Sequence, residues 1–432
     1  MFRRFVVLAI ALAMLVPVTV ATNAQETTDL TFWTFVDAHA DYWLSQVDRW
    51  NEANPDRPIS LTPSVIPWDD MHRNLLAALL VGSGAPDIVD VEINRFATFV
   101  KGDIHLVDMT DMVEPYRADL IETRLAPYQW QGAQYGVDYH LGAYLMFYNR
   151  EILEEAGVDP DSIVTWDDYI EAGKQVTRDT DGDGDIDVWM CPLETGSEHI
   201  ARAILLMKGG GIYNAEGDLI LDSPENVEAL QFLQSLVNEH GICSIAPGTH
   251  VHHEEFFGAF AQGQFASVWM PQWYWIRFRD NMEGMEGKLI PRPMPIFEEG
   301  GYTTAMGGGT TTVATDQIPD DELQLAKDFI AFGKLTYEAG VQIATVLGFD
   351  PIRLDVYDDP ALQEPNAFLS NEPMFQIIKS QLGNVAPEYT GPLFPEARDA
   401  IATVVLYEVL ENGADPAEML SRAQDQVLAA AE

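Results

Sequence analysis

The chain has 432 residues, of which 47% are hydrophobic and 21% charged, the balance of a folded globular protein. Acidic side chains outnumber basic ones by 68 to 24, for a formal net charge of −44. This surface excludes nucleic acid and anionic membranes as partners, because it repels polyanions. The length exceeds what one hydrophobic core ordinarily supports, so we expect two lobes.

Residues 1–24 have the pattern of a secretory signal peptide. Arg3 and Arg4 precede an apolar run from Phe5 to Val20, and the small residues 22–24 offer a cleavage site. No cysteine lies near that site, which argues against a lipoprotein anchor. We therefore expect an exported protein, periplasmic or at the cell surface. A twin-arginine route and an uncleaved anchor are the alternatives.

Strand and helix signals alternate in the first part of the mature chain. Three apolar runs predict strands, and two amphipathic stretches between them predict helices. The strands are expected at 30–35, 59–65 and 86–91, and the helices at 40–52 and from Trp68 to the turn at 82–85. Strands that alternate with helices imply parallel pairing.

A second pattern of strand and helix signals lies between Tyr135 and Asp168. Tyr144–Tyr148 is aromatic and apolar, as in a buried strand, and Glu151–Glu155 supplies helix formers. Thr165 is a favourable N-cap with Asp168 three residues on, so a further helix is expected to begin at Trp166. Taken alone, these signals describe one strand–helix–helix unit of an α/β protein.

The order of short motifs in this region resembles one protein family. They are Tyr-Gly-Val at 135–137, Tyr-Asn-Arg at 148–150, Ala-Gly-Val at 156–158 and Thr-Trp-Asp-Asp at 165–168. Together they are similar to the family 1 extracellular solute-binding proteins of ABC importers, the group that contains maltose-binding protein. Glycine turns at 209–211, 263 and 307–309 occur in the same order, so the resemblance covers nearly everything after residue 26.

The resemblance implies an α/β fold of the two-lobed, type II periplasmic-binding-protein kind. Each lobe would be a mixed, largely parallel sheet flanked by helices, with the ligand cleft between the lobes. The first lobe would comprise residues 26–138 and 306–350, and the second 142–302 and 354–432. Crossings near 138–142, 302–308 and 347–353 would act as hinges. We expect a monomer, not an enzyme, that captures a carbohydrate and delivers it to the permease of an ABC importer.

Aromatic and polar residues at family positions are the candidate ligand contacts, because sugars stack on flat rings and offer hydroxyls to polar groups. By resemblance, Asn94 and Arg95 hold hydroxyls and Trp273 stacks on the sugar. Phe394 and Arg398 match an aromatic–arginine pair, although tryptophan is usual at the first position. Further candidates, for which structural packing is the alternative, are Trp33, Trp68, Asp138, His140 and Trp269.

The segment 179–187 resembles the start of an EF-hand calcium loop. Carboxylates occupy positions 1, 3, 5, 7 and 9, namely Asp179, Asp181, Asp183, Asp185 and Asp187. Acids this close repel one another without a cation, so we expect structural calcium. Met190 stands where the loop ordinarily has glutamate, so water or another carboxylate must complete the site. A solvated acidic turn is the alternative.

Two further features involve cysteine and histidine. Cys191 and Cys243 are the two cysteines of the chain, and a disulfide between them is expected in an oxidising compartment. Two free thiols are the alternative. The string 250–255 is rich in histidine, but its spacing does not match a zinc site, and an exposed helix start is the better interpretation.

Two other functions stay open. The first is a secreted, calcium-dependent carbohydrate-active enzyme, although the chain has neither a Gly-x-Ser-x-Gly elbow nor a phosphate loop. The second is a receptor subunit that presents its ligand and uses the same fold. Turnover of a sugar would identify the enzyme, and a neighbouring gene for a receptor kinase instead of a permease would identify the receptor.

Overall fold

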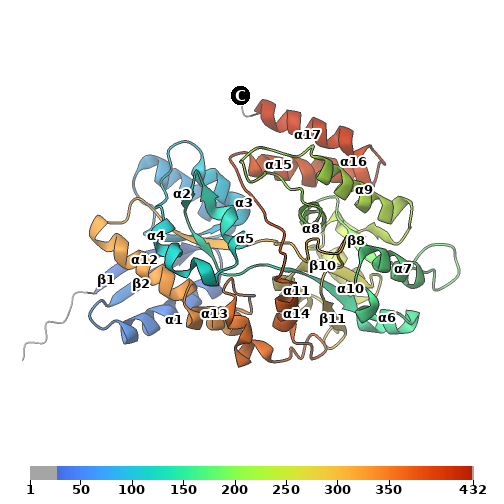
Figure 1. Cartoon of the computed structure of the whole chain (residues 1–432), viewed down its shortest axis with the longest axis horizontal. Helices are drawn as coiled ribbons and strands as arrows, with labels where there is room; N and C mark the ends of the chain where they lie inside the picture. The colour runs from blue at the N-terminus through green and yellow to red at the C-terminus, as the bar shows by residue number, and fades with distance from the viewer. Residues whose placement is uncertain (1–26, 431–432) are drawn as a thin grey trace, which may run out of the picture.

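The computed structural model describes residues 27–430, so the predicted signal peptide lies outside the described residues. The protein has two lobes side by side (Figure 1), and each has its own buried core. One core is built from hydrophobic residues of 30–139 and 313–352, and the other almost entirely from residues of 141–306 and 356–427. The predicted fold class, a two-lobed α/β protein, is confirmed.

The first lobe contains a five-stranded sheet in the order β2-β1-β3-β12-β6. Its strands are β1 (Thr28–Thr34), β2 (Ile59–Val65), β3 (Ile88–Glu92), β6 (Val137–Asp138) and β12 (Thr310–Ala314). β1 pairs in parallel with β2 and β3, whereas β12 is antiparallel to both of its neighbours. A strand from late in the chain therefore completes the first lobe.

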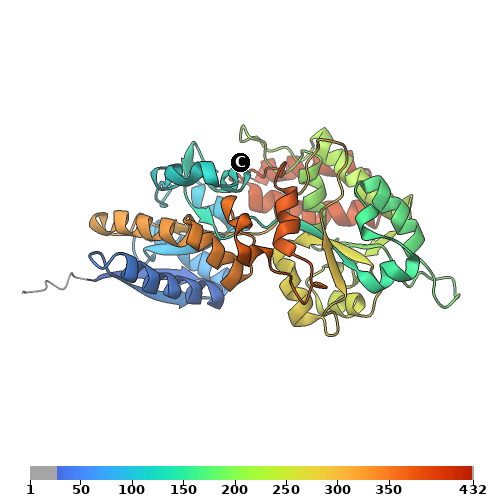
Figure 2. The same ribbon diagram turned by 60° about the horizontal axis from the view of Figure 1, so that its bottom comes forward.

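The helices of the first lobe pack on this sheet and on one another (Figures 1 and 2). They are α1 (Asp37–Ala53), α2 (Trp68–Val81), α3 (Ile93–Phe96), α4 (Thr110–Val113), α5 (Glu122–Leu125), α12 (Asp320–Lys334) and α13 (Tyr337–Gln342). Trp43 of α1 is fully buried against Phe329 of α12, with 5.1 Å between ring centroids. Gly333 makes this approach possible, because a Cβ there would lie 2.4 Å from the indole.

The second lobe has β7 (Tyr144–Asn149) between β10 (Ser267–Pro271) and β11 (Leu289–Arg292). Both neighbours are antiparallel to β7, so the expected parallel pairing does not extend to this sheet. Alternation of strands and helices along the sequence does not encode strand direction. A separate parallel pair, β8 (Cys191–Leu193) and β9 (Cys243–Ile245), carries a disulfide between Cys191 and Cys243.

The remaining helices surround these strands (Figure 1). They are α6 (Arg150–Ala156), α7 (Trp166–Val176), α8 (His199–Met207), α9 (Pro224–Asn238), α10 (Glu254–Ala261), α11 (Trp275–Asn281), α14 (Met374–Gln381), α15 (Phe394–Ala400), α16 (Leu406–Leu410) and α17 (Pro416–Ala430). The capping box predicted at Thr165 and Asp168 is confirmed at the start of α7. Within residues 27–430, no helix is both long and apolar enough to cross a bilayer.

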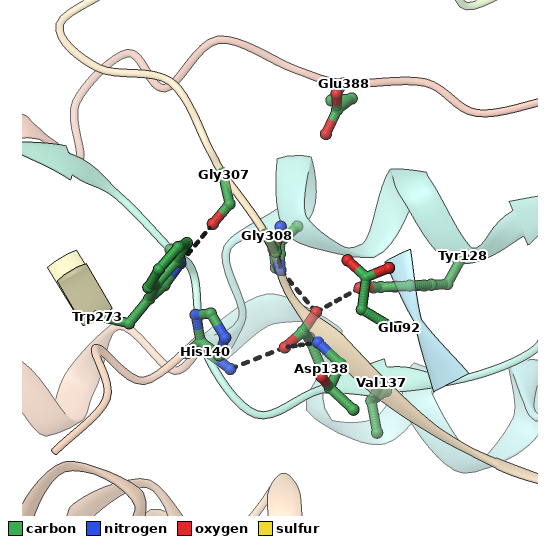
Figure 3. Close-up of polar contacts among 12 residues, drawn as sticks. Glu92, Tyr128, Val137, Asp138, His140, Trp273, Gly307, Gly308 and Glu388 are labelled. Carbon is green, nitrogen blue, oxygen red and sulfur yellow. Dashed lines mark hydrogen bonds and ion pairs between the residues drawn. The ribbon is translucent and has the colours of Figure 1, made fainter. Parts of the chain in front are cut away.

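Two buried carboxylates hold together the segments that pass between the lobes. Asp138 accepts hydrogen bonds from Arg124 Nη2 (2.6 Å), the Tyr128 hydroxyl, and the amides of His140 (3.1 Å) and Thr310 (3.2 Å) (Figure 3). Thr310 begins β12, directly after the crossing at 302–308, so this carboxylate connects the first crossing to the end of the second.

Asp350 makes the corresponding connection to the third crossing. It accepts the amides of Gly142 (3.1 Å) and Ala143 (2.8 Å), and its own carbonyl accepts the amide of Leu141. Both carboxylates are fully buried. The crossings are therefore a connected hydrogen-bonded unit and not three independent linkers.

We expect Asp138→Asn to destabilise the protein by about 3–5 kcal/mol, because it leaves the buried guanidinium of Arg124 without its counter-charge. Guanidinium-induced unfolding measures this loss. Lys174→Ala, which removes an exposed ion pair with Glu171, is the control and should cost about 1 kcal/mol at most. Equal effects of the two substitutions would contradict the role assigned to Asp138.

Candidate ligand-binding site

Charged side chains from both lobes meet beside the crossings. Arg202 of α8 donates from Nε to Glu388 Oε1 (2.7 Å) and from Nη1 to Asn94 Oδ1 (3.3 Å). Arg398 of α15 donates from Nε to Glu198 Oε1 (2.6 Å). Arg202, Glu198 and Glu388 are each at most 5% exposed. The bond to Asn94 joins the second lobe to the first.

Glu92 extends this cluster within the first lobe. It stands at the N-cap of α3 and accepts the backbone amide of Asn94 (3.0 Å) and its side-chain amide (2.9 Å). Burial raises the pKa of Glu92 to about 7, although Arg398 and Arg202 act in the opposite direction. Figure 3 shows Glu92 and Glu388 on the same side of the crossing at Gly308.

Several buried polar atoms of this region have no hydrogen-bond partner among residues 27–430. They are Ser197 Oγ, Glu198 Oε2, His199 Nδ1 and Glu388 Oε2. Burial opposes ionisation of Glu198, but His199 and the two arginines together hold its pKa at about 2. Because buried polar groups are almost always paired, this concentration of unpaired donors and acceptors is suited to a polar, hydroxyl-rich ligand.

Trp273 lies next to these groups, just beyond the end of β10. Its Nε1 donates to the Gly307 carbonyl (2.9 Å), which belongs to the second crossing (Figure 3). Its ring is 6.4 Å from that of His199, centroid to centroid. The indole is partly exposed and offers an aromatic surface beside the polar cluster.

Three other candidates lie in the first lobe, and the structure does not join them to this cluster. The guanidinium of Arg95 covers the ring of Trp68 at 4.4 Å and pairs with Asp69 (3.0 Å). Trp33 packs, partly buried, against the core of the first lobe. Arg95 and Trp68 thus contact each other. Trp33, Trp68 and Arg95 are all partly exposed.

Two of the predicted aromatic contacts, Trp269 and Phe394, lie in the protein core in this structure. Trp269 is fully buried in β10, and its Nε1 donates to the carbonyl of Ile200 (2.9 Å), so it is a core residue. Phe394 is also fully buried, with the guanidinium of Arg202 over its ring at 5.6 Å.

The two predicted contacts in the first crossing, Asp138 and His140, are also buried in this structure. The Asp138 carboxylate uses both of its oxygens to accept four hydrogen bonds, as described above, so its role is structural. His140 is 5% exposed and packs on the ring of Phe349, with centroids 4.6 Å apart. Burial lowers the pKa of His140 to about 3, which keeps the imidazole neutral.

Sequence reasoning missed Glu92, Ser197, Glu198, Arg202 and Glu388. In a chain with 68 acidic residues, an isolated glutamate carries no distinguishing signal. Glu198 and Arg202 are four residues apart at the start of a predictable helix. This spacing is the one local signal that connects them. Their importance depends on partners far away in the sequence.

The acidic loop lies apart from this cluster. Carboxylate oxygens of Asp179, Asp181 and Asp187 lie within 4.8 Å of one another, whereas Asp183 and Asp185 are outside this group. The Asp179 carboxylate also accepts the amides of Gly182 (2.6 Å) and Gly184 (2.9 Å). The loop is folded around the carboxylate of Asp179.

Two lobes with separate cores, linked by three crossings and lined by polar groups, define a protein that encloses a small polar solute. Residues 37–334 match the family described as bacterial extracellular solute-binding protein. The chain belongs to this family, which confirms the resemblance seen in its sequence.

Two relatives and one solved structure are similar to this chain. The chain is 40% identical to an arabinooligosaccharide-binding protein of Halalkalibacterium halodurans, over 94% of this chain and 90% of that protein. It is 38% identical to one of Bacillus subtilis, over 93% and 92%. The fold is similar to that of the cyclic α-maltosyl-1,6-maltose binding protein of Arthrobacter globiformis, with a TM-score of 0.76 at 21% identity over 94% and 99% of the chains.

The raised pKa of Glu92 predicts a pH-dependent stability. Its pKa of about 7 lies above the ordinary 4.5, so the stability gained by protonation is complete below pH 4.5 and lost as pH rises through 7. Glu92→Gln keeps an amide acceptor and removes this titration. Between pH 5 and 8, wild type should lose about 1–3 kcal/mol relative to the variant in denaturant unfolding. Parallel pH profiles would contradict the burial of a neutral Glu92.

Proposed function

We propose that the protein captures an arabinose-containing oligosaccharide outside the cytoplasm and delivers it, as a monomer, to the permease of an ABC importer. Family membership supports the capture role. The two relatives named for arabinooligosaccharides, at 40% and 38% identity over nine-tenths of each chain, support the sugar. We also propose export through a cleaved signal peptide at 1–24, without a lipid anchor.

The polar interlobe cluster is the observation that carries this proposal. Carboxylates of Glu92, Glu198 and Glu388 accept hydrogen bonds from hydroxyls, and Arg202 and Arg398 donate them. When Glu92 is protonated, the carboxylates of Glu198 and Glu388 balance the guanidiniums of Arg398 and Arg202, so no excess positive charge is left for an anionic ligand. A neutral, hydroxyl-rich molecule satisfies such a site.

Lobe closure follows from where these groups lie. Asn94 and Glu92 belong to the first lobe, and Arg202 and Glu388 to the second. A ligand that contacts both sets stabilises the closed arrangement by the difference between its contacts in the two states. The closed conformation then indicates to the permease that a ligand is bound.

Catalysis is not part of the proposal. The relatives are binding proteins, and the polar cluster is explained by ligand binding alone. A carbohydrate-active enzyme would consume the sugar, whereas a binding protein returns it intact.

The test is calorimetric titration and thermal unfolding with arabino-oligosaccharides, with malto-oligosaccharides for comparison. A ligand at 100 times its Kd should add about 2.7 kcal/mol of stability, and chromatography should recover the sugar unchanged. Arg202→Ala should weaken binding by at least about tenfold, because it removes a buried charged partner of the ligand. Arg150→Ala, at an exposed position, is the matched control.

The absence of any carbohydrate-induced shift would rule out the sugar assignment. Sustained breakdown of the sugar would favour the enzyme.

We propose in addition that the loop 179–187 binds calcium as a structural element. The convergence of Asp179, Asp181 and Asp187 supports this, as does the turn at Gly184, whose φ is +103°. Asp183 and Asp185 would have to move toward the ion. The hard carboxylate oxygens favour calcium over softer transition metals.

Calcium should raise the Tm of the metal-free protein by about 2 °C or more, and EDTA should reverse the change. Asp179→Asn should abolish this response, because Asp179 provides the first ligand of the loop. Asp103→Asn, at an exposed position elsewhere, should keep it. A Tm that is independent of calcium in wild type would show that the loop is a solvated acidic turn.

A further inference from the structure

The histidine string has an organisation that its sequence spacing did not reveal. His252 lies beside His199 and His250, with ring centroids 5.1 Å and 5.2 Å away. This group of rings lies directly behind Trp273, the partly exposed tryptophan of the candidate site. The string is therefore neither a zinc motif nor merely an exposed helix start.

The imidazole of His252 is stacked on the indole of Trp273. Their planes differ by 16°, and their centroids are 5.8 Å apart. His199 approaches the same indole edge-on, at 79°. The indole Nε1 is bonded to Gly307, so contacts on one face, at one edge and through the N–H together fix the ring.

His252 is itself held in place. Its ring packs edge-on against Tyr274 (5.1 Å), and its backbone amide donates to His250 Nδ1 (3.1 Å). Burial, together with the neighbouring His199 and His250, lowers the pKa of His252 to about 2. A neutral imidazole can stack on an indole without the cost of burying a charge.

The two segments that contain His199 and His252 are joined by hydrogen bonds to the carboxyl group of Glu194. The 1%-exposed carboxylate of Glu194 accepts the amide of Val251 (2.9 Å) and the amide of Ile200 (3.0 Å). Just before these segments, the disulfide connects β8 to β9. His199 and His252 therefore belong to one rigid platform.

We propose that His252 is a positioning residue for the ligand. It covers one face of Trp273 and presents the opposite face, already oriented, to a sugar ring. This inference rests on the proposed function and deepens it, because it identifies how the stacking surface is prepared. Immobilising a side chain before binding removes an entropic cost that otherwise lowers the affinity about 2- to 10-fold.

The experiment compares His252→Ala with His252→Phe, which keeps a flat ring. His252→Ala should weaken the binding of an arabino-oligosaccharide about 2- to 10-fold, and His252→Phe should restore it to within about twofold of wild type. In a Trp273→Ala background, His252→Ala should have no further effect, because the ring that it positions is gone. Titration calorimetry gives the affinities of wild type and the four variants, and Tm values confirm folding.

Near-ultraviolet circular dichroism gives a second readout that needs no ligand. The signal that Trp273→Ala removes should also be reduced in His252→Ala and kept in His252→Phe. Equal behaviour of the two His252 variants, or additive losses in the double variant, would overturn the proposal. If wild type binds no sugar, the proposed function fails, and the dichroism still decides whether His252 orients Trp273.

Discussion

The buried carboxylate of Asp138 is the interaction on which the interlobe region depends. An ionised group without solvent contact must be neutralised and hydrogen-bonded, and Asp138 achieves this with Arg124, Tyr128 and two amides, one from the first crossing and one from the start of β12. Arg124 also donates to the Gly308 carbonyl (2.6 Å). The close approach requires Gly309, where a Cβ would lie 1.7 Å from the guanidinium. One buried ion pair thus fixes where the lobes meet, and hence the relative placement of Glu92 and Trp273.

The chemistry of the site departs from simple aromatic stacking. At the end where Phe394 is found, the guanidinium of Arg202 covers the ring and is itself paired with Glu388. Charged groups thus cover the ring of Phe394, and Trp273 is the partly exposed aromatic residue beside the polar cluster. In so acidic a chain, the buried Arg202 and the partly exposed Arg398 form a local concentration of positive charge, balanced by neighbouring glutamates.

Local elements were predictable from the sequence, and the identity of the site residues was much less so. β2 coincides with the predicted strand at 59–65, and α2 begins at Trp68 as expected, because apolar periodicity and capping act within a few residues. Which polar groups meet between the lobes depends on partners that are distant in the sequence. Trp269 and Trp273 illustrate the limit: they are four residues apart, yet one is within a buried strand and the other lies just beyond its end. The resemblance to the family pointed to Asn94, Trp273 and Arg398, which lie in or beside the polar cluster, and to Phe394, which is fully buried.

The position of β12 has a consequence for how the protein forms. This strand lies between β3 and β6, yet it is separated from them by the whole second-lobe sheet in the sequence. The first lobe cannot complete its sheet until more than 300 residues have been synthesised, and pairings of such long range form slowly. A nascent chain therefore cannot complete its first lobe until the strands of the second lobe have been synthesised. The discontinuous first lobe thus makes its own folding depend on the synthesis of the second.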